Sequence, residues 1–207
     1  MRMKKYADSY LSYFLMYAFY YLGWALFSSL ISIYLIGLGF KPSQVAIVLS
    51  VSYITSMLVQ PFIGKLCDKY TSRKVNIFLF LLAAVGGLLF IFAKNFIAIV
   101  IGYSFVIMLV NGTNPAMERI ASSSKYAYGK IRIWGTIGYA TGTQLAGILY
   151  EQIAPSSIFI AFIISFIISA IGAYGTVSHD QIEEVEISEM NQEIKFYKNK
   201  EYISFLI

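Results

Sequence analysis

Six long apolar runs dominate the sequence, and each is long enough to cross a bilayer as a helix. A spanning helix needs about 20 mostly apolar residues. The runs cover about 10–37, 44–63, 75–93, 96–117, 133–152 and 157–176. We therefore predict an all-α membrane protein with six transmembrane helices. The first run is long enough to tilt or to extend past the hydrocarbon.

The composition excludes several other classes of protein. Of the 207 residues, 58% are hydrophobic and 13% are charged, whereas soluble domains carry about 25% charged residues. This balance argues against a soluble domain, a disordered chain and a nucleic-acid-binding module, despite the net charge of +5. With one Cys and one His, the chain is predicted to hold no metal and no cofactor.

The positions of Lys and Arg predict the orientation in the membrane. Fourteen of the 16 lie before the first run, around the connectors after the second and fourth runs, or in the tail, and the other two are Lys41 and Lys94. Because cytoplasmic segments are enriched in Lys and Arg, we expect a multi-pass cell-membrane protein with both ends in the cytoplasm. No small-residue cleavage site follows the first run, so we expect it to be retained.

A shift of 83 residues lays the first three runs on the last three. It also places Gly64-x-Leu66-x-Asp68 on Gly147-x-Leu149-x-Glu151. Three spans are an odd number, so the second unit must be inverted relative to the first, as in the halves of many transporters. A chance match of two short strings is the alternative. Two inverted three-helix repeats predict alternating access to a site between similar units.

The connector after the second run resembles the signature between helices 2 and 3 of the major facilitator superfamily. It runs from Gly64 to Lys74, with Thr71 where the family usually has Gly, and its matching residues are Gly64, Asp68, Lys69, Arg73 and Lys74. The resemblance implies half of a major facilitator fold, with a gating role in which Asp68 helps to lock two halves in one state. Ordinary cytoplasmic positive charge with one compensating acid is the alternative.

Two more strings, 115–118 and 128–139, resemble the oligosaccharide:proton symporters, the lactose-permease-like branch of this superfamily. The resemblance implies that Glu118 and Arg132 hold sugar hydroxyls and that Tyr139 stacks on the sugar ring. Tyr139 replaces the Trp of that branch, and the segment from the acid to the Arg is four residues shorter. Nucleoside carriers have a similar helix 5, so both sugar and nucleoside stay open as solutes.

Helical spacing places polar residues on common faces of the fourth and fifth runs. Asn111, Asn114 and Glu118 share one face, and we predict that this face contacts the solute. Arg132 lies beside a seam of small residues, which are Gly135, Gly138, Gly142 and Ala146. Glu118 and Arg132 have opposite charges near the cytoplasmic end, so we predict that they pair in a cleft open to a hydroxylated solute. A purely structural ion pair, or an Arg132 that reaches the membrane interface, is the alternative.

The first run carries an aromatic stripe, of which Tyr20 and Trp24 are predicted to stack on a solute. Packing or an interfacial belt is the alternative. The predicted domains are a six-helix bundle at 1–176, a cytoplasmic linker at 177–200 and the start of a seventh helix at 201–207. The chain would then be an amino-terminal half that lacks its carboxy-terminal six-helix partner.

We therefore predict a secondary active transporter for a small hydroxylated solute, either sugar or nucleoside. The resemblance alone implies proton coupling. The expected partners are the lipid bilayer, the solute and protons, with no nucleic acid. A same-fold exporter of amphiphilic compounds and a non-transporting membrane subunit are the alternatives. We do not predict an enzyme, because the sequence shows no metal-binding helix motif and no nucleophile elbow.

Overall fold

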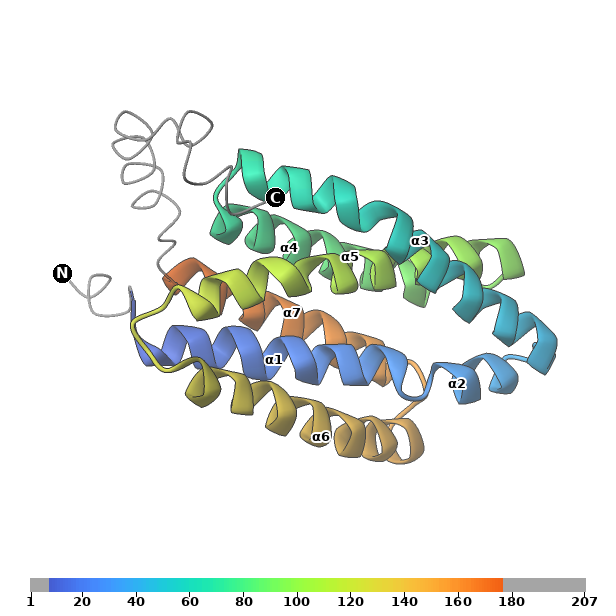
Figure 1. Ribbon diagram of the computed structural model, residues 1–207. Coiled ribbons are helices and arrows are strands. Elements are labelled where there is room, and N and C mark those ends of the chain that lie inside the picture. The colour runs from blue at the N-terminus through green and yellow to red at the C-terminus, as the bar shows by residue number, and fades with distance from the viewer. Residues whose placement is uncertain (1–7, 177–207) are drawn as a thin grey trace, which may run out of the picture.

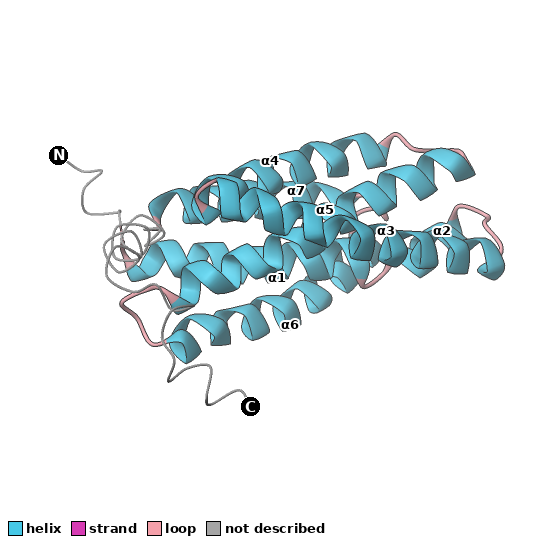
Figure 2. Ribbon diagram, turned by 45° about the horizontal axis from the view of Figure 1, so that its top comes forward, coloured by secondary structure: helices cyan, strands magenta, loops and turns pink. Residues whose placement is uncertain are grey.

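A computed structural model describes residues 8–176, and every regular element in this range is a helix (Figure 2). The helices are α1 (Tyr10–Ser28), α2 (Ile31–Gly37), α3 (Pro42–Lys69), α4 (Ser72–Ile91), α5 (Phe96–Ser122), α6 (Tyr128–Gln152) and α7 (Ser157–Gly175). The segment α1–α2 and each later helix cross the bundle in alternating directions (Figure 1). The described range therefore starts and finishes at one end of the bundle, where the Asp8 amide donates to the Gly175 carbonyl over 2.8 Å. The predicted linker at 177–200 and the predicted helix start at 201–207 lie outside the described residues.

The first predicted span forms two helices in the structure, because the helical conformation is interrupted between Ser28 and Ile31. The Ser28 hydroxyl donates to the Trp24 carbonyl over 2.7 Å, and the Ser29 hydroxyl donates to the Ala25 carbonyl over 2.6 Å. Serine hydroxyls that bond back to the preceding turn compete with the helical ladder and bend helices. The predicted span 10–37 is found as one membrane-length segment, and this pair of serines explains why it consists of two consecutive helices.

Several helices continue past the apolar runs that predicted them. Most of the expected connector 64–74 is helical, since α3 ends at Lys69 and α4 begins at Ser72. The turn is Tyr70–Thr71, and Thr71 has a φ of −52°, so this turn requires no glycine. Charged residues can remain helical here because they lie at the polar end of the bundle.

Within residues 8–176, five helical segments are both long and apolar enough to cross a membrane, with α1 and α2 counted as one. The remaining predicted span, 133–152, lies in α6, which is 25 residues long but less apolar than the others. It nevertheless lies alongside α1 over its length (Figure 1). Its polar residues are needed for the site described below.

The packing of the helices has the symmetry that the repeat predicts. The helix α1 packs on α6 and α7, and its counterpart α5 packs on α3 and α4, whereas α4 and α7 pack on each other. The first repeat comprises α1, α3 and α4, and the second comprises α5, α6 and α7. Exchanging each helix for its counterpart gives the same set of packed pairs. At the crossing of α1 and α5, the Tyr20 hydroxyl donates to the Val110 carbonyl over 2.7 Å, and Tyr103 stacks on Phe27 at 5.4 Å. Tyr103 and Val110 are the counterparts of Tyr20 and Phe27 at the 83-residue shift.

Candidate functional site

A seam of small residues holds α6 against α1. Its members are buried on α6, and they are Gly135, Gly138, Gly142 and Ala146. A Cβ atom added to Gly142 would lie 2.6 Å from the Leu22 carbonyl oxygen, so a larger residue could not approach this closely. Between lipid-embedded helices, close backbone approach is a main source of stability. The predicted seam is confirmed, and it places Arg132, Thr136 and Tyr139 along the border of the α1–α6 contact.

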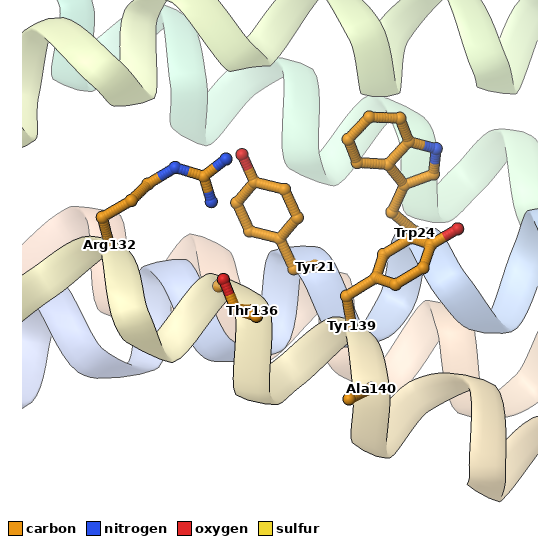
Figure 3. A pocket seen from close by; sticks show the side chains of 7 residues that line it. Tyr21, Trp24, Arg132, Thr136, Tyr139 and Ala140 are labelled. Atoms are coloured by element: carbon orange, nitrogen blue, oxygen red, sulfur yellow. The ribbon is translucent and has the colours of Figure 1, made fainter.

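A cavity of about 470 Å³ opens along this border (Figure 3). It is lined by Tyr21, Trp24, Arg132, Gly135, Thr136, Tyr139 and Ala140. Sites for small molecules usually measure about 300–1,000 Å³. Figure 3 shows the Arg132 guanidinium beside the Tyr21 hydroxyl at one end, with the Trp24 and Tyr139 rings at the other. The cavity therefore offers a charged end and an aromatic end.

Glu118 of α5 and Arg132 of α6 form an ion pair beside this cavity. The Arg132 Nε atom lies 3.5 Å from Glu118 Oε1, and the two side chains are 38% and 32% exposed. The Tyr128 hydroxyl donates to the other carboxylate oxygen, Oε2. The predicted contact between Glu118 and Arg132 is confirmed. Arg132 lines the cavity, and Glu118 lies behind it as its ion-pair partner, with both side chains partly exposed.

Tyr21 supports the same arginine from α1. The Arg132 guanidinium carbon lies 4.6 Å from the centroid of the Tyr21 ring, which is a favourable cation–π distance. The Tyr21 hydroxyl donates to Asn114 Oδ1 over 3.3 Å. Asn114 therefore belongs to the neighbourhood of the site, through a contact with Tyr21.

Tyr21 and Tyr128 also belong to the site, and neither was predicted from the sequence. Tyr21 precedes Trp24 by three residues, and residues with this spacing share a helix face, so the position of Trp24 could have indicated it. Tyr128 lies in the helical turn before Arg132 and follows the same rule. Neither contact could be deduced without the placement of α5 against α1 and α6.

Trp24 and Tyr139 form the aromatic end of the cavity. Their ring centroids are 6.2 Å apart, and the rings are nearly perpendicular at 86°. The Tyr139 ring is 41% exposed. Two rings in this arrangement present apolar surface beside a polar hydroxyl, which suits a ring that carries both CH and OH groups.

Four predicted site residues do not line the cavity. Glu118 and Asn114 each contact a residue that does, whereas Tyr20 and Asn111 have other contacts. Tyr20 is fully buried, and its ring packs on Phe80 and Phe166, so it has no free face on which a solute could stack. The Asn111 amide donates to Ser56 Oγ of α3 over 3.2 Å. The structure therefore corrects the prediction for Tyr20 to helix packing and assigns Asn111 a contact between α5 and α3.

The sequence profile of the Major Facilitator Superfamily matches residues 13–199. The chain belongs to this superfamily. Sucrose permease of Escherichia coli is 29% identical over 145 residues, which cover 64% of this chain and 35% of that permease. Maltose permease of Geobacillus stearothermophilus is 29% identical over 129 residues, which cover 59% of this chain and 32% of the permease. The chain thus matches about a third of the length of these relatives.

The segment 64–74, which resembles the superfamily signature, begins in the last turns of α3. Gly64 and Asp68 border a cavity of about 180 Å³ between α3 and α5, together with Pro115 and Arg119. The Asp68 Oδ1 atom lies 3.9 Å from Arg119 Nη1. This long, exposed ion pair joins the two helices at the charged end of the bundle.

The other three predicted gating residues, Lys69, Arg73 and Lys74, lie outside the cavity that Gly64 and Asp68 border. Arg73 Nη1 donates to the Thr176 carbonyl over 3.1 Å. The Lys69 ammonium lies 5.5 Å from the Tyr70 ring centroid, and Lys74 borders a separate groove between α3 and α4. The five predicted gating residues therefore do not form one cluster, and their role in gating stays a prediction.

Proposed function

We propose that this chain is the amino-terminal half of a secondary active transporter that moves a sugar by alternating access, coupled to protons. The observation that carries the proposal is Arg132, which pairs with Glu118 and lines the charged end of a cavity whose other end holds Trp24 and Tyr139. A nucleoside is the second candidate solute, since it also combines hydroxyl groups with an apolar ring face.

The pair is suited to hydroxyl groups because it combines an acceptor with several donors. A carboxylate accepts from a hydroxyl, and a guanidinium donates to one. A charge-assisted N–H···O bond is usually about 2.7–2.9 Å long, whereas the Nε–Oε1 separation here is 3.5 Å. The loose contact supports the proposal that both groups keep hydrogen-bonding capacity for a solute.

The names of the relatives favour sugar over nucleoside. Permeases named for sucrose, maltose and lactose each match this chain at 29% identity. The match covers about a third or less of each, so the solute, the proton coupling and the missing carboxy-terminal half are all part of the proposal. In this proposal, 177–200 links the halves and 201–207 begins the second.

We further propose that the end of the bundle bearing both described termini faces the cytoplasm of a cell membrane. The helix ends and turns at this end carry most of the cationic side chains of the described range, including Lys69, Arg73 and Lys125. This distribution supports the orientation expected from the excess of Lys and Arg in cytoplasmic loops.

An exporter of amphiphilic compounds is less consistent with the site. Such a carrier would be expected to have an apolar lining without the Glu118–Arg132 pair. A non-transporting subunit would bind no solute, so an uptake measurement distinguishes it from the proposed carrier.

The test is uptake by the full-length protein in vesicles, with a panel of sugars and nucleosides and an imposed proton gradient. We expect uptake of a sugar, and we expect Glu118→Gln and Arg132→Lys each to abolish it without loss of folding or insertion. Glu151→Gln and Lys130→Arg are matched controls away from the pair. Normal uptake by either site variant would refute the site, and failure to take up any solute would refute the transport function.

A further inference from the structure

A groove of about 260 Å³ separates the end of α3 from the start of α4. It is lined by Leu66, Tyr70, Lys74, Val75 and Phe78. The helix α3 packs on α5, and α4 packs on α5 and α7, whereas α3 and α4 contact each other little, so their side chains leave this space unfilled. Apart from the Lys74 ammonium and the Tyr70 hydroxyl, the lining is apolar.

The groove is positively charged at the end of the bundle where α3 meets α4. Lys74 borders it directly, and the Lys69 ammonium lies 5.5 Å from the centroid of the Tyr70 ring. The nearest acid in the sequence, Asp68, contacts Arg119 on the side of α3 that faces α5. Two ammonium groups therefore flank Tyr70 at the mouth of an apolar groove.

An apolar stripe continues from this charged end along α4. Lys74, Phe78, Leu81 and Val85 recur at the spacing of one helix face. Phe78, Leu81 and Val85 are 58%, 46% and 52% exposed. At 1.5 Å per residue the stripe is about 16 Å long, which is roughly half of the 30 Å hydrocarbon core. Its length therefore corresponds to one leaflet.

We propose that this groove binds one anionic phospholipid. The phosphate contacts the Lys74 and Lys69 ammonium groups, one acyl chain lies over Leu66 and Phe78, and Tyr70 lies at the level of the headgroups. Cationic side chains attract anionic headgroups at the membrane surface, and Tyr rings favour the interface. The inference needs only that the chain is embedded in a membrane, so it does not depend on the identity of the solute.

The experiment is native mass spectrometry of the full-length protein, purified in detergent and titrated with phosphatidylglycerol or phosphatidylcholine of matched acyl chains. We expect one phosphatidylglycerol to bind more tightly than phosphatidylcholine. Lys74→Gln should weaken that binding about fivefold, and Lys69→Gln combined with it should weaken it about 25-fold. Lys74→Arg keeps the positive charge, so it should bind phosphatidylglycerol as tightly as the unchanged protein does. Lys130→Gln removes a charge at the same end of the bundle but outside the groove, so it should have little effect.

A second variant distinguishes the effect of the groove's shape on lipid binding from the effect of its charge. Leu66→Trp fills the groove and keeps both lysines, so it should also weaken the binding of phosphatidylglycerol. Equal binding of the two lipids, or equal losses in Lys74→Gln and Lys130→Gln, would overturn the proposal. Unchanged binding in Leu66→Trp, or equally tight binding of glycerol phosphate without acyl chains, would also overturn it. Thermal unfolding of each variant shows whether it is folded.

Discussion

The guanidinium of Arg132 lies against the face of the Tyr21 ring, 4.6 Å from its centroid. The same guanidinium pairs with Glu118, so α1 and α5 position one side chain of α6 from two sides. Because three helices meet at this side chain, its position depends on how they pack. Substitutions at its neighbours should therefore change solute binding even where they leave both charges in place.

Replacement of Tyr21 tests this support. Tyr21→Leu removes the cation–π contact, which is worth about 0.5–2 kcal/mol, so solute affinity should fall by a factor of about 2 to 30. Tyr21→Phe keeps the ring and loses only the bond to Asn114, so its effect should be smaller. Binding of the transported solute to the purified protein measures both. Equal losses in the two variants would show that the ring face does not support Arg132.

Tyr128→Phe removes the hydroxyl that donates to Glu118. A hydrogen bond contributes about 1 kcal/mol, so we expect solute affinity to fall about fivefold while the protein stays folded. Tyr53→Phe is the control, since Tyr53 is an exposed residue of α3 outside the site. Unchanged affinity in Tyr128→Phe would mean that the hydroxyl does not help to hold the carboxylate.

Gly138→Ala should destabilise the bundle. The added methyl group would collide with the Ala18 carbonyl on α1, and overpacking of this kind costs about 1–3 kcal/mol. Gly147→Ala on the same helix is the matched control, because nothing lies within 4 Å of its added Cβ. The midpoint of thermal unfolding in detergent should fall only for Gly138→Ala. If the midpoint changed equally in both variants, the change would come from replacing glycine in a helix. The α1–α6 contact would then not be its cause.

Asp68→Asn should slow the turnover of the full-length transporter more than it weakens solute binding. The substitution removes the ion pair with Arg119 at the charged end of the bundle, away from the cavity that Arg132 lines. The measurements are the rate of uptake at saturating solute and the affinity of the purified protein. Glu151→Gln changes the acid at the matching repeat position and is the control. A selective loss of affinity would contradict a gating role for Asp68.

The sequence was sufficient to predict the helices and several of their contacts. Hydropathy identifies the runs that form α3, α4, α5 and α7, because a segment is stable across the bilayer only if it is long, apolar and helical, whatever its neighbours. The small-residue seam on α6 and the Glu118–Arg132 pair could also be predicted, since helical spacing determines which side chains share a face. The break between α1 and α2 could not, because Ser28 and Ser29 are compatible with a continuous apolar run.

The amino-acid order by itself determined a membrane-spanning all-α chain with a repeated triplet of helices and one opposite-charge pair at the charged end. Only the tertiary structure decided which aromatic residue serves the site, since Tyr20 and Tyr21 are neighbours with the same side chain. Helix packing buries Tyr20 against Phe80 and Phe166 and leaves Tyr21 beside Arg132. The physical reason is that a helix turns by about 100° per residue, so the choice between adjacent residues depends on how the helix is rotated against its neighbours.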